Sequence, residues 1–403
     1  MLVREMIRNV YKECKGVPKS NCLTKEQRLS LQMDEFMNRR YEFRYNTQIG
    51  EVEYRERFSF RFYFHPIDKR AQNSIMLDAQ SEGIGVWDRD IDRYLHSNRV
   101  PIYNPLEEFL FHLPHWDGKD RIHALANRVP CNNPHWELLF HRWFLNMVSH
   151  WRGVNKMYAN STSPILVGAQ GTHKSTFCRE MIPPALRAYY TDSIDFSQKR
   201  DAELYLNRFA LINIDEFDQI TLTQQGFLKH ILQKPVVNLR KPHGRSVLEL
   251  QRYASFIGTS NQKDLLTDPS GSRRFICIEV TGNIDTTQPI DYEQLYAQAM
   301  HEISHGERYW FNSEDEQIMT ENNREFEQTP AMLQLFYQYF RAPQAGEEGE
   351  FFTPVEILNY LKKKSGISLS DNKVYHFGRM LQKCGITSKH TYKGTVYQVV
   401  KIL

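Results

Sequence analysis

Residues 163–177 read SPILVGAQGTHKSTF, an apolar run followed by a glycine-bearing turn, a lysine and a serine. The apolar run predicts a short buried strand, and the residues after Lys174 predict a helix. A loop between a strand and a helix points its backbone N–H groups at an anion near the helix N-terminus, where the helix dipole also favours negative charge. The stretch therefore predicts a phosphate-binding loop in an α/β fold built on a parallel sheet.

The whole turn is a candidate ATP site. Lys174 offers a positive charge to the β- and γ-phosphates, and Ser175 offers a hydroxyl to Mg²⁺. His173 stands where glycine usually precedes the lysine. With an ordinary φ its imidazole would point outward, whereas a positive φ would cost about 1–3 kcal/mol and weaken nucleotide binding without abolishing it. The candidate nucleotide-binding residues are Gly168, Gln170, Gly171, Thr172, His173, Lys174, Ser175 and Thr176.

Two later segments predict further core strands that end in polar side chains. Residues 208–218, RFALINIDEFD, end in two carboxylates. Asp215 is the candidate metal ligand, and Glu216 is the candidate general base for the attacking water. Residues 253–261, YASFIGTSN, end in Asn261, which would hold the γ-phosphate or the water. The local alternatives are a capped helix start for the acidic pair and a turn residue for Asn261.

A fourth segment, DPSGSRRF at 268–275, places Arg273 and Arg274 on a loop. A guanidinium there can stabilise charge on the transferring phosphoryl group, often across a subunit boundary. The local alternative is a pair of surface arginines. The order of a phosphate loop, an acidic strand, a polar strand end and an arginine loop favours ATP hydrolysis over the three local alternatives taken together.

Several of these segments together resemble the virulence-associated protein E family. They are GAQGTHKSTF, INIDEFD, LRKPHGR, FIGTSNQ and DPSGSRRF, and the upstream stretch YNPLEEFLFHLPHWDGKDRI also resembles that family. Its ATPase core is similar to superfamily 3 helicases of phages and mobile elements. The resemblance implies an AAA+-like, ring-forming, DNA-dependent ATPase, with ATP and Mg²⁺ as cofactors. It also implies that Asn261 is a sensor and that Arg273 or Arg274 is an arginine finger.

Two basic regions are candidate DNA contacts. LRKPHGR lies where superfamily 3 proteins carry a hairpin that touches DNA, and its basic residues would grip single-strand phosphates without reading sequence. The alternative is a solvated basic turn. The second region, near the C-terminus, has its candidate contacts on a predicted helix. The candidates in both regions are Arg240, Lys241, His243, Arg245, Lys373 and Arg379.

The C-terminal segment 351–403 carries nine Lys or Arg against two acidic residues, although the net charge of the whole chain is only +3. Thr353 and Pro354 predict a helix start. A second helix from Ser370 and a hairpin follow, so the segment predicts a winged-helix-like module. Such a module often places its second helix in the DNA major groove. The alternative is a winged helix that docks on protein.

The remaining features set the domain plan. We expect an N-terminal α+β region over 1–98, a helical collar over 99–155, the ATPase over 156–342, and the basic module over 351–403 after a linker at 343–350. Alternation around a turn predicts a hairpin in the N-terminal region. The DRDID stretch that follows reads as helix rather than as a two-metal site.

The six cysteines are scattered and no apolar stretch is long enough to span a membrane, so we expect a cytoplasmic protein without a membrane partner. The favoured function is a helicase that hydrolyses ATP between the protomers of a hexamer-type ring and acts on single-stranded or forked DNA. One alternative is a non-translocating ATPase switch or loader. Another is a DNA-binding replication protein with a weakened ATPase site.

Overall fold

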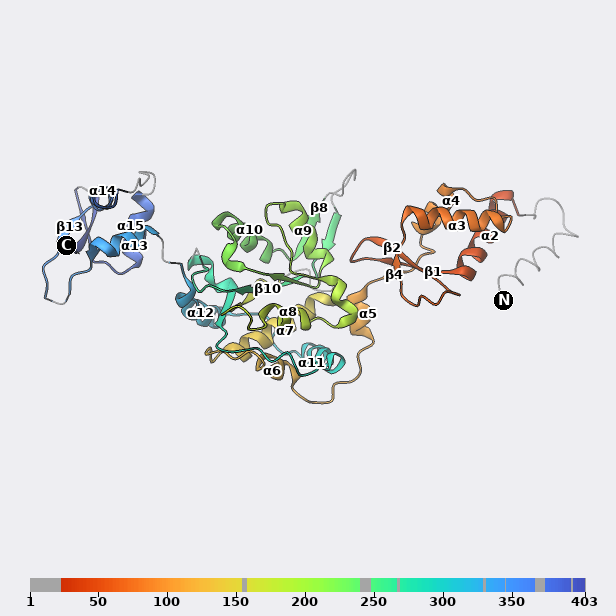
Figure 1. The fold of residues 1–403 in the computed structure, drawn as a ribbon, viewed down its shortest axis with the longest axis horizontal. Coiled ribbons are helices and arrows are strands. Elements are labelled where there is room, and N and C mark those ends of the chain that lie inside the picture. Colours follow the sequence, from red (N-terminus) through yellow and green to blue (C-terminus); the bar gives the residue numbers. More distant parts are fainter. Residues whose placement is uncertain are drawn as a thin grey trace, which may run out of the picture.

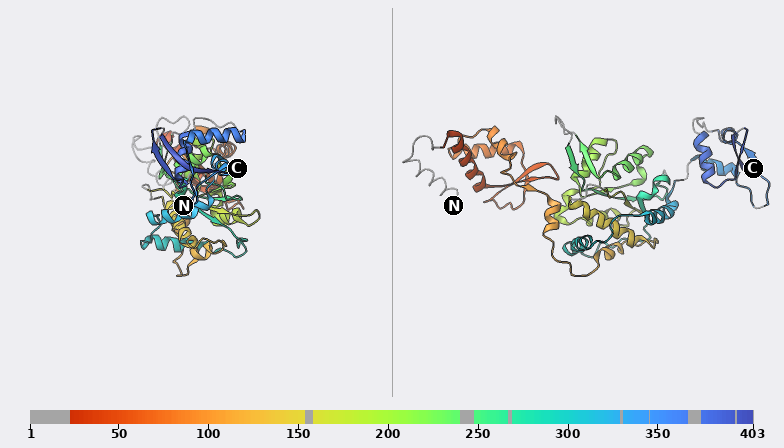
Figure 2. Two further views of the ribbon diagram at one scale, coloured as in Figure 1. Left: turned by 90° about the vertical axis from the view of Figure 1, so that its left-hand side faces the viewer. Right: turned by 180° about the vertical axis from the view of Figure 1, so that it is seen from behind.

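The computed structural model describes residues 23–153, 158–239, 248–266, 269–328, 331–344, 346–366, 374–392 and 394–402. Three units follow one another along the long axis of the molecule (Figure 1). An N-terminal unit lies at one end, a large central unit carries most of the helices, and a small C-terminal unit lies at the other end. The view from behind in Figure 2 shows the same row.

The central unit contains a five-stranded sheet in which every neighbouring pair is parallel. The predicted α/β fold with a parallel sheet is therefore confirmed. The strands in the middle of the sheet are buried on both faces, which explains why they read as unbroken apolar runs. In spatial order the strands are β11 (Phe275–Glu279), β5 (Ser163–Val167), β10 (Ser255–Ser260), β7 (Leu211–Ile214) and β6 (Tyr190–Thr191).

Helices cover both faces of this sheet. Because side chains alternate along a strand, Leu166 of β5 packs on one face while Ile165 and Val167 pack on the other. The first face is covered by α5 (Pro105–Phe111), α6 (Arg121–Ala126), α7 (Trp136–Trp151), α8 (Lys174–Glu180) and α11 (Tyr292–Ser304). The second face is covered by α9 (Lys199–Arg208) and α10 (Leu222–Leu232), which lie above the sheet in Figure 1.

The remaining short elements of the central unit lie around the sheet. The antiparallel pair β8 (Val236–Leu239) and β9 (Leu248–Gln251) stands apart from it. The helix α12 (Ser313–Asn322) follows α11 in the chain. The 3₁₀ helices are η2 (Pro184–Tyr189), η3 (Phe217–Gln219), η4 (Pro269–Arg274) and η5 (Asn323–Phe326).

The N-terminal unit packs three helices against a four-stranded sheet with the order β3-β2-β1-β4. The predicted hairpin is confirmed as β1 and β2, and the DRDID stretch is helical as predicted. In the described ranges, no three His, Cys, Asp or Glu side chains are placed to hold a metal ion. The elements are α2 (Lys25–Arg40), β1 (Tyr41–Asn46), β2 (Glu51–Glu56), β3 (His65–Pro66), α3 (Lys69–Ser81), α4 (Asp88–Leu95) and β4 (Ile102–Tyr103).

The C-terminal unit has its own core. The predicted helix start is confirmed, because the Thr353 side chain accepts a hydrogen bond from the Glu356 backbone in a capping box, and Pro354 is the first helical residue. The predicted hairpin is also present as β14 and β15. The elements are α13 (Ala331–Tyr339), β12 (Phe340–Arg341), β13 (Glu350–Phe352), α14 (Pro354–Ser365), α15 (Val374–Lys383), β14 (Ser388–Thr391) and β15 (Gly394–Lys401).

Core packing does not follow the expected limits at every point. Phe336 and Phe340 share the C-terminal core with Leu358 and Phe377, so core residues lie on both sides of the expected linker at 343–350. Likewise, α7 from the expected collar shares one core with the sheet. A division of the chain into separate folding units at the expected limits stays a prediction. Among the described helices, none is long and apolar enough to cross a membrane.

A buried polar network ties α7 to the sheet and to α10. The His150 Nδ1 atom lies 3.0 Å from the Asn146 carbonyl, and its Nε2 accepts the Asn160 backbone N–H at 3.2 Å. The Asn160 carbonyl in turn accepts a hydrogen bond from Arg252, which is fully buried and also donates to carbonyls at the end of α10. Burial, and then the charge of Arg252, lower the pKa of His150 to about 4.

This pKa predicts acid sensitivity of the central unit. The unfolded chain binds a proton on His150 near pH 6.5 and the folded chain only near pH 4, so stability is full above pH 6.5 and falls as the pH drops toward 4. The contribution is about 3 kcal/mol. Denaturant unfolding followed by tryptophan fluorescence at several pH values should show this loss. His150→Gln should remove this pH-dependent loss of stability. His112→Gln, which changes an exposed side chain, should keep the wild-type pH profile.

Candidate functional site: a polar cavity at the carboxyl edge of the sheet

The loop between β5 and α8 lies at the carboxyl edge of the parallel sheet, which is where open α/β sheets bind ligands. Asp215 follows β7, and Asn261 follows β10, the strand between β5 and β7. All three segments therefore reach the same edge. They enclose a cavity of about 330 Å³, lined by Gln170, Gly171, Thr172, His173, Lys174, Ser175, Thr176, Asp215, Glu216, Thr259, Ser260 and Asn261.

Lys174 is the buried cation of this cavity. Its side-chain amine donates to the carbonyls of Gly168 at 2.8 Å and Ala169 at 2.7 Å, and to Asn261 Oδ1 at 3.2 Å. Burial lowers the pKa of Lys174, and the nearby Asp215 carboxylate opposes that shift. The amine is thus anchored between the loop and the end of β10, and the Lys174 side chain lines the cavity.

Asp215 is linked to α8 and to β10 through hydroxyl groups. Its Oδ1 accepts a hydrogen bond from Ser175 Oγ at 3.0 Å and another from the Thr259 hydroxyl. The sequence prediction included Ser175 and Asp215 but missed Thr259, which lies on β10. A hydroxyl and a carboxylate are ligands that Mg²⁺ accepts in an otherwise hydrated shell, so these residues fit the expected ion.

Two residues of the cavity have left-handed backbone conformations. His173 has φ = 65° and Glu216 has φ = 53°. The alternative of an ordinary φ at His173 is therefore wrong, because the chain turns into α8 through the left-handed region. Such conformations cost about 1–3 kcal/mol in residues with a side chain and are concentrated at functional sites. No sequence signal marked Glu216 as strained.

Gly168 has a steric role. A Cβ there would lie 2.9 Å from the Val280 carbonyl oxygen, so a side chain would separate β5 from the segment after β11. Gly168 supports the loop from outside the set of residues that line the cavity. Gly171, with φ = 84°, requires its conformational freedom instead, because that angle is unfavourable for other residues.

Arg273 and Arg274 are not brought to this cavity. They end η4 just before Phe275, which pairs with Ser163 at the start of β5. The loop that lines the cavity follows the other end of β5, and the four steps from Ser163 to Val167 at about 3.3 Å each put about 13 Å between the two ends. Arg273 pairs with Glu316 at 2.9 Å, and both arginines line a separate cavity of about 590 Å³.

The candidate DNA contacts are mostly beyond what the structure describes. Arg240, Lys241, His243, Arg245 and Lys373 lie outside the described residues. The arms of the expected hairpin are present as the antiparallel pair β8 and β9. Arg379 is exposed on α15.

Sequence comparison places the chain in a family. A model of the virulence-associated protein E-like domain matches residues 110–328, which is more than half of the chain. The chain therefore belongs to the virulence-associated protein E-like family. Residues 329–399 match a domain of unknown function described from B. theta, DUF3874. No curated protein matches the sequence.

The chain is also similar to solved structures at low sequence identity. The apo C-terminal region of NrS-1 has a TM-score of 0.46 and 12% identity, over 92% of this chain and 98% of that one. An A form of the same region has a TM-score of 0.43 and 10% identity, over 90% of this chain and 96% of that one. A likeness at this level implies nothing about activity.

The left-handed conformation of His173 gives a stability prediction. His173→Gly should raise the free energy of unfolding by about 1 kcal/mol, because glycine adopts a positive φ without strain but loses more entropy on folding. Denaturant unfolding provides the measurement. Ala169→Gly, in the same loop at an exposed position without a positive φ, is the matched control and should lower stability. Equal effects of the two changes would contradict the strain at His173.

Proposed function

We propose that the chain is a DNA-dependent ATPase of the helicase type. One observation carries this proposal: Lys174, Asp215 and Asn261 come from three segments far apart in the sequence and line one polar cavity at the carboxyl edge of a parallel sheet. Lys174 and Asp215 are held there by hydrogen bonds to other groups of the protein. Pre-organised charges of this kind stabilise transferring phosphoryl groups.

Each residue then has a specific task. Lys174 would turn its amine from the loop carbonyls toward the β- and γ-phosphates of ATP. Ser175 and Asp215 would hold Mg²⁺, which neutralises phosphate charge when bound. Glu216 would accept a proton from the attacking water, and Asn261 would orient that water or the γ-phosphate. The backbone N–H groups from Gln170 to Thr176 would surround the phosphates.

The position of the two arginines favours an ATP site that is completed by a second protomer. Arg273 and Arg274 lie at the opposite edge of the sheet from the cavity, so in our proposal they act on the ATP of a neighbouring protomer. A hexamer-type ring with an AAA+-like ATPase core satisfies this geometry, because each protomer then offers its arginine edge to the next protomer's cavity. The β8–β9 hairpin and the winged-helix-like C-terminal unit would contact single-stranded or forked DNA.

A second candidate function has a specific observation in its favour. The left-handed His173 weakens the phosphate loop, which fits a DNA-binding protein with a slow ATPase. A non-translocating switch or loader would hydrolyse ATP without unwinding. ATPase rates with and without single-stranded DNA, together with a strand-unwinding assay, separate the three functions.

Glu216→Gln should abolish ATP turnover while leaving ATP binding intact, because the amide cannot accept the proton of the attacking water. Lys174→Ala should lose turnover and bind ATP at least tenfold more weakly, because the phosphates lose their buried positive charge. Phosphate release and nucleotide-binding titrations measure the two effects. Lys199→Ala, on α9 away from the cavity, is the control. Turnover at the wild-type rate in either site variant would refute the assignment.

Mixing two inactive variants tests the arginine edge. Lys174→Ala and Arg273→Ala/Arg274→Ala should each lack turnover alone. A mixture should regain a fraction of the activity, because some interfaces then combine an intact cavity with intact arginines from the neighbour. Phosphate release at a fixed total protein concentration measures the recovery. A mixture as inactive as its components would place the arginines outside the reaction.

A further inference from the structure

Residues 57–64, RFSFRFYF, form a loop between β2 and β3 that we call the aromatic loop. It exposes four large rings: Phe58 at 86%, Phe60 at 96%, Phe62 at 77% and Tyr63 at 64% of their full accessibility. A globular protein rarely leaves a contiguous apolar patch in water unless something binds there. None of the ATPase residues proposed above belongs to this loop.

The loop is anchored at both ends, so its rings stay exposed to solvent and do not fold back onto the protein. Arg57 donates to the Asn38 carbonyl at 2.8 Å and to Glu42 at 2.6 Å. Arg55 donates to the Phe62 carbonyl at 2.9 Å. At the far end, the Phe64 ring has the guanidinium of Arg44 at 4.0 Å and that of Arg55 at 4.7 Å from its centroid.

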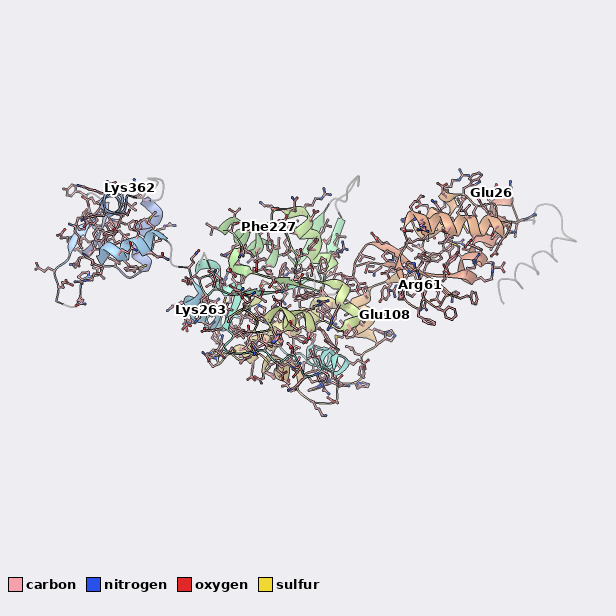
Figure 3. All side chains as sticks on the ribbon, in the orientation of Figure 1. Glu26, Arg61, Glu108, Phe227, Lys263 and Lys362 are labelled. Atoms are coloured by element: carbon pink, nitrogen blue, oxygen red, sulfur yellow. The ribbon has the colours of Figure 1, made fainter. Side chains whose placement is uncertain are left out.

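The charge of the loop selects an anionic partner. Residues 57–67 contain two arginines and no acidic residue; Arg57 pairs with Glu42, whereas Arg61 is exposed between Phe60 and Phe62. Figure 3 labels Arg61 in the N-terminal unit. A partner that combines negative charge with flat π faces at short intervals is single-stranded nucleic acid, whose bases stack on aromatic rings while arginines meet the phosphates. Exposed rings on a firm backbone with an arginine between them match that chemistry.

A lipid surface fits less well. The aromatic loop is neither helical nor part of a strand, so its backbone N–H and C=O groups would lack partners in a bilayer. An amphipathic surface helix avoids that penalty, and no such helix carries these rings.

We propose that the aromatic loop is a binding site for single-stranded DNA, which stacks its bases on Phe58, Phe60 and Phe62. The site lies in the N-terminal unit, which is joined to the central unit by a buried hydrogen bond from Asn46 to Tyr189 at 2.8 Å. DNA held by the loop is thus tethered to the ATPase. The proposal rests on the proposed function only in requiring that the chain acts on single-stranded DNA.

The test measures the affinity of the full chain for a fluorescent oligo(dT) by anisotropy, without nucleotide. The F58A/F60A/F62A variant should bind at least tenfold more weakly, since stacking energies per base are of that order. F58L/F60L/F62L should be equally weak because leucine has no π face, whereas F58Y/F60Y/F62Y should bind like wild type. Phe111→Ala, equally exposed at 83% on α5, is the matched control and should leave the affinity unchanged.

Three further measurements distinguish DNA binding by the loop from ATP hydrolysis, from lipid binding and from self-association. Glu216→Gln should bind oligo(dT) like wild type, so loss of hydrolysis does not bear on this site. Wild-type affinity in the alanine or leucine variant overturns the proposal. The proposal is also overturned if the alanine or leucine variant keeps its oligo(dT) affinity but no longer binds anionic phospholipid vesicles, which would assign the loop to a membrane. It is likewise overturned if such a variant keeps its oligo(dT) affinity but changes its mass in solution, which would assign the loop to contact with a second copy of the chain.

Discussion

The burial of the middle strands of the central sheet on both faces is the constraint on which the rest of the structure depends. Side chains of β5, β7 and β10 alternate between two cores, which leaves these strands mostly apolar. The charged and amide side chains of the candidate site follow the strands along the chain and do not lie within them. Parallel order then brings the ends of these three strands to one edge, where Lys174, Asp215 and Asn261 meet.

The same constraint separates the two halves of the candidate site. A residue that follows a parallel strand and a residue that precedes one lie at opposite edges of the sheet. Asn261 follows β10 and reaches the cavity, whereas Arg274 precedes β11 and cannot. A single chain with this topology thus places a polar cavity at one edge and the pair Arg273 and Arg274 at the other. In the ring that we propose, head-to-tail association of copies brings these two edges together.

Sequence reasoning succeeded where a residue's position follows from the end of a strand. Lys174, Asp215 and Asn261 were found because continuous apolar runs mark buried strands, and the polar residue after each run lies at the sheet edge. Thr259 was missed because it belongs to such a run, and only the hydrogen bond to Asp215 distinguishes it from a packing residue. Likewise, the steric role of Gly168 depends on Val280, more than a hundred residues away.

Backbone conformation was the least accessible property. The sequence alone could not decide whether His173 has a positive φ. That angle depends on how the loop closes, and hydrogen bonds from Lys174 to the carbonyls of Gly168 and Ala169 close it. The aromatic loop illustrates the same limit: Phe58, Phe60 and Phe62 recur at every second position, yet their rings lie in water. The outward display follows from the arginines that hold its ends, because Arg57 ties the start to Glu42 and Arg55 ties Phe62 in place. A segment fixed in this way exposes its rings without a core of its own, and this exposure makes it available to a partner.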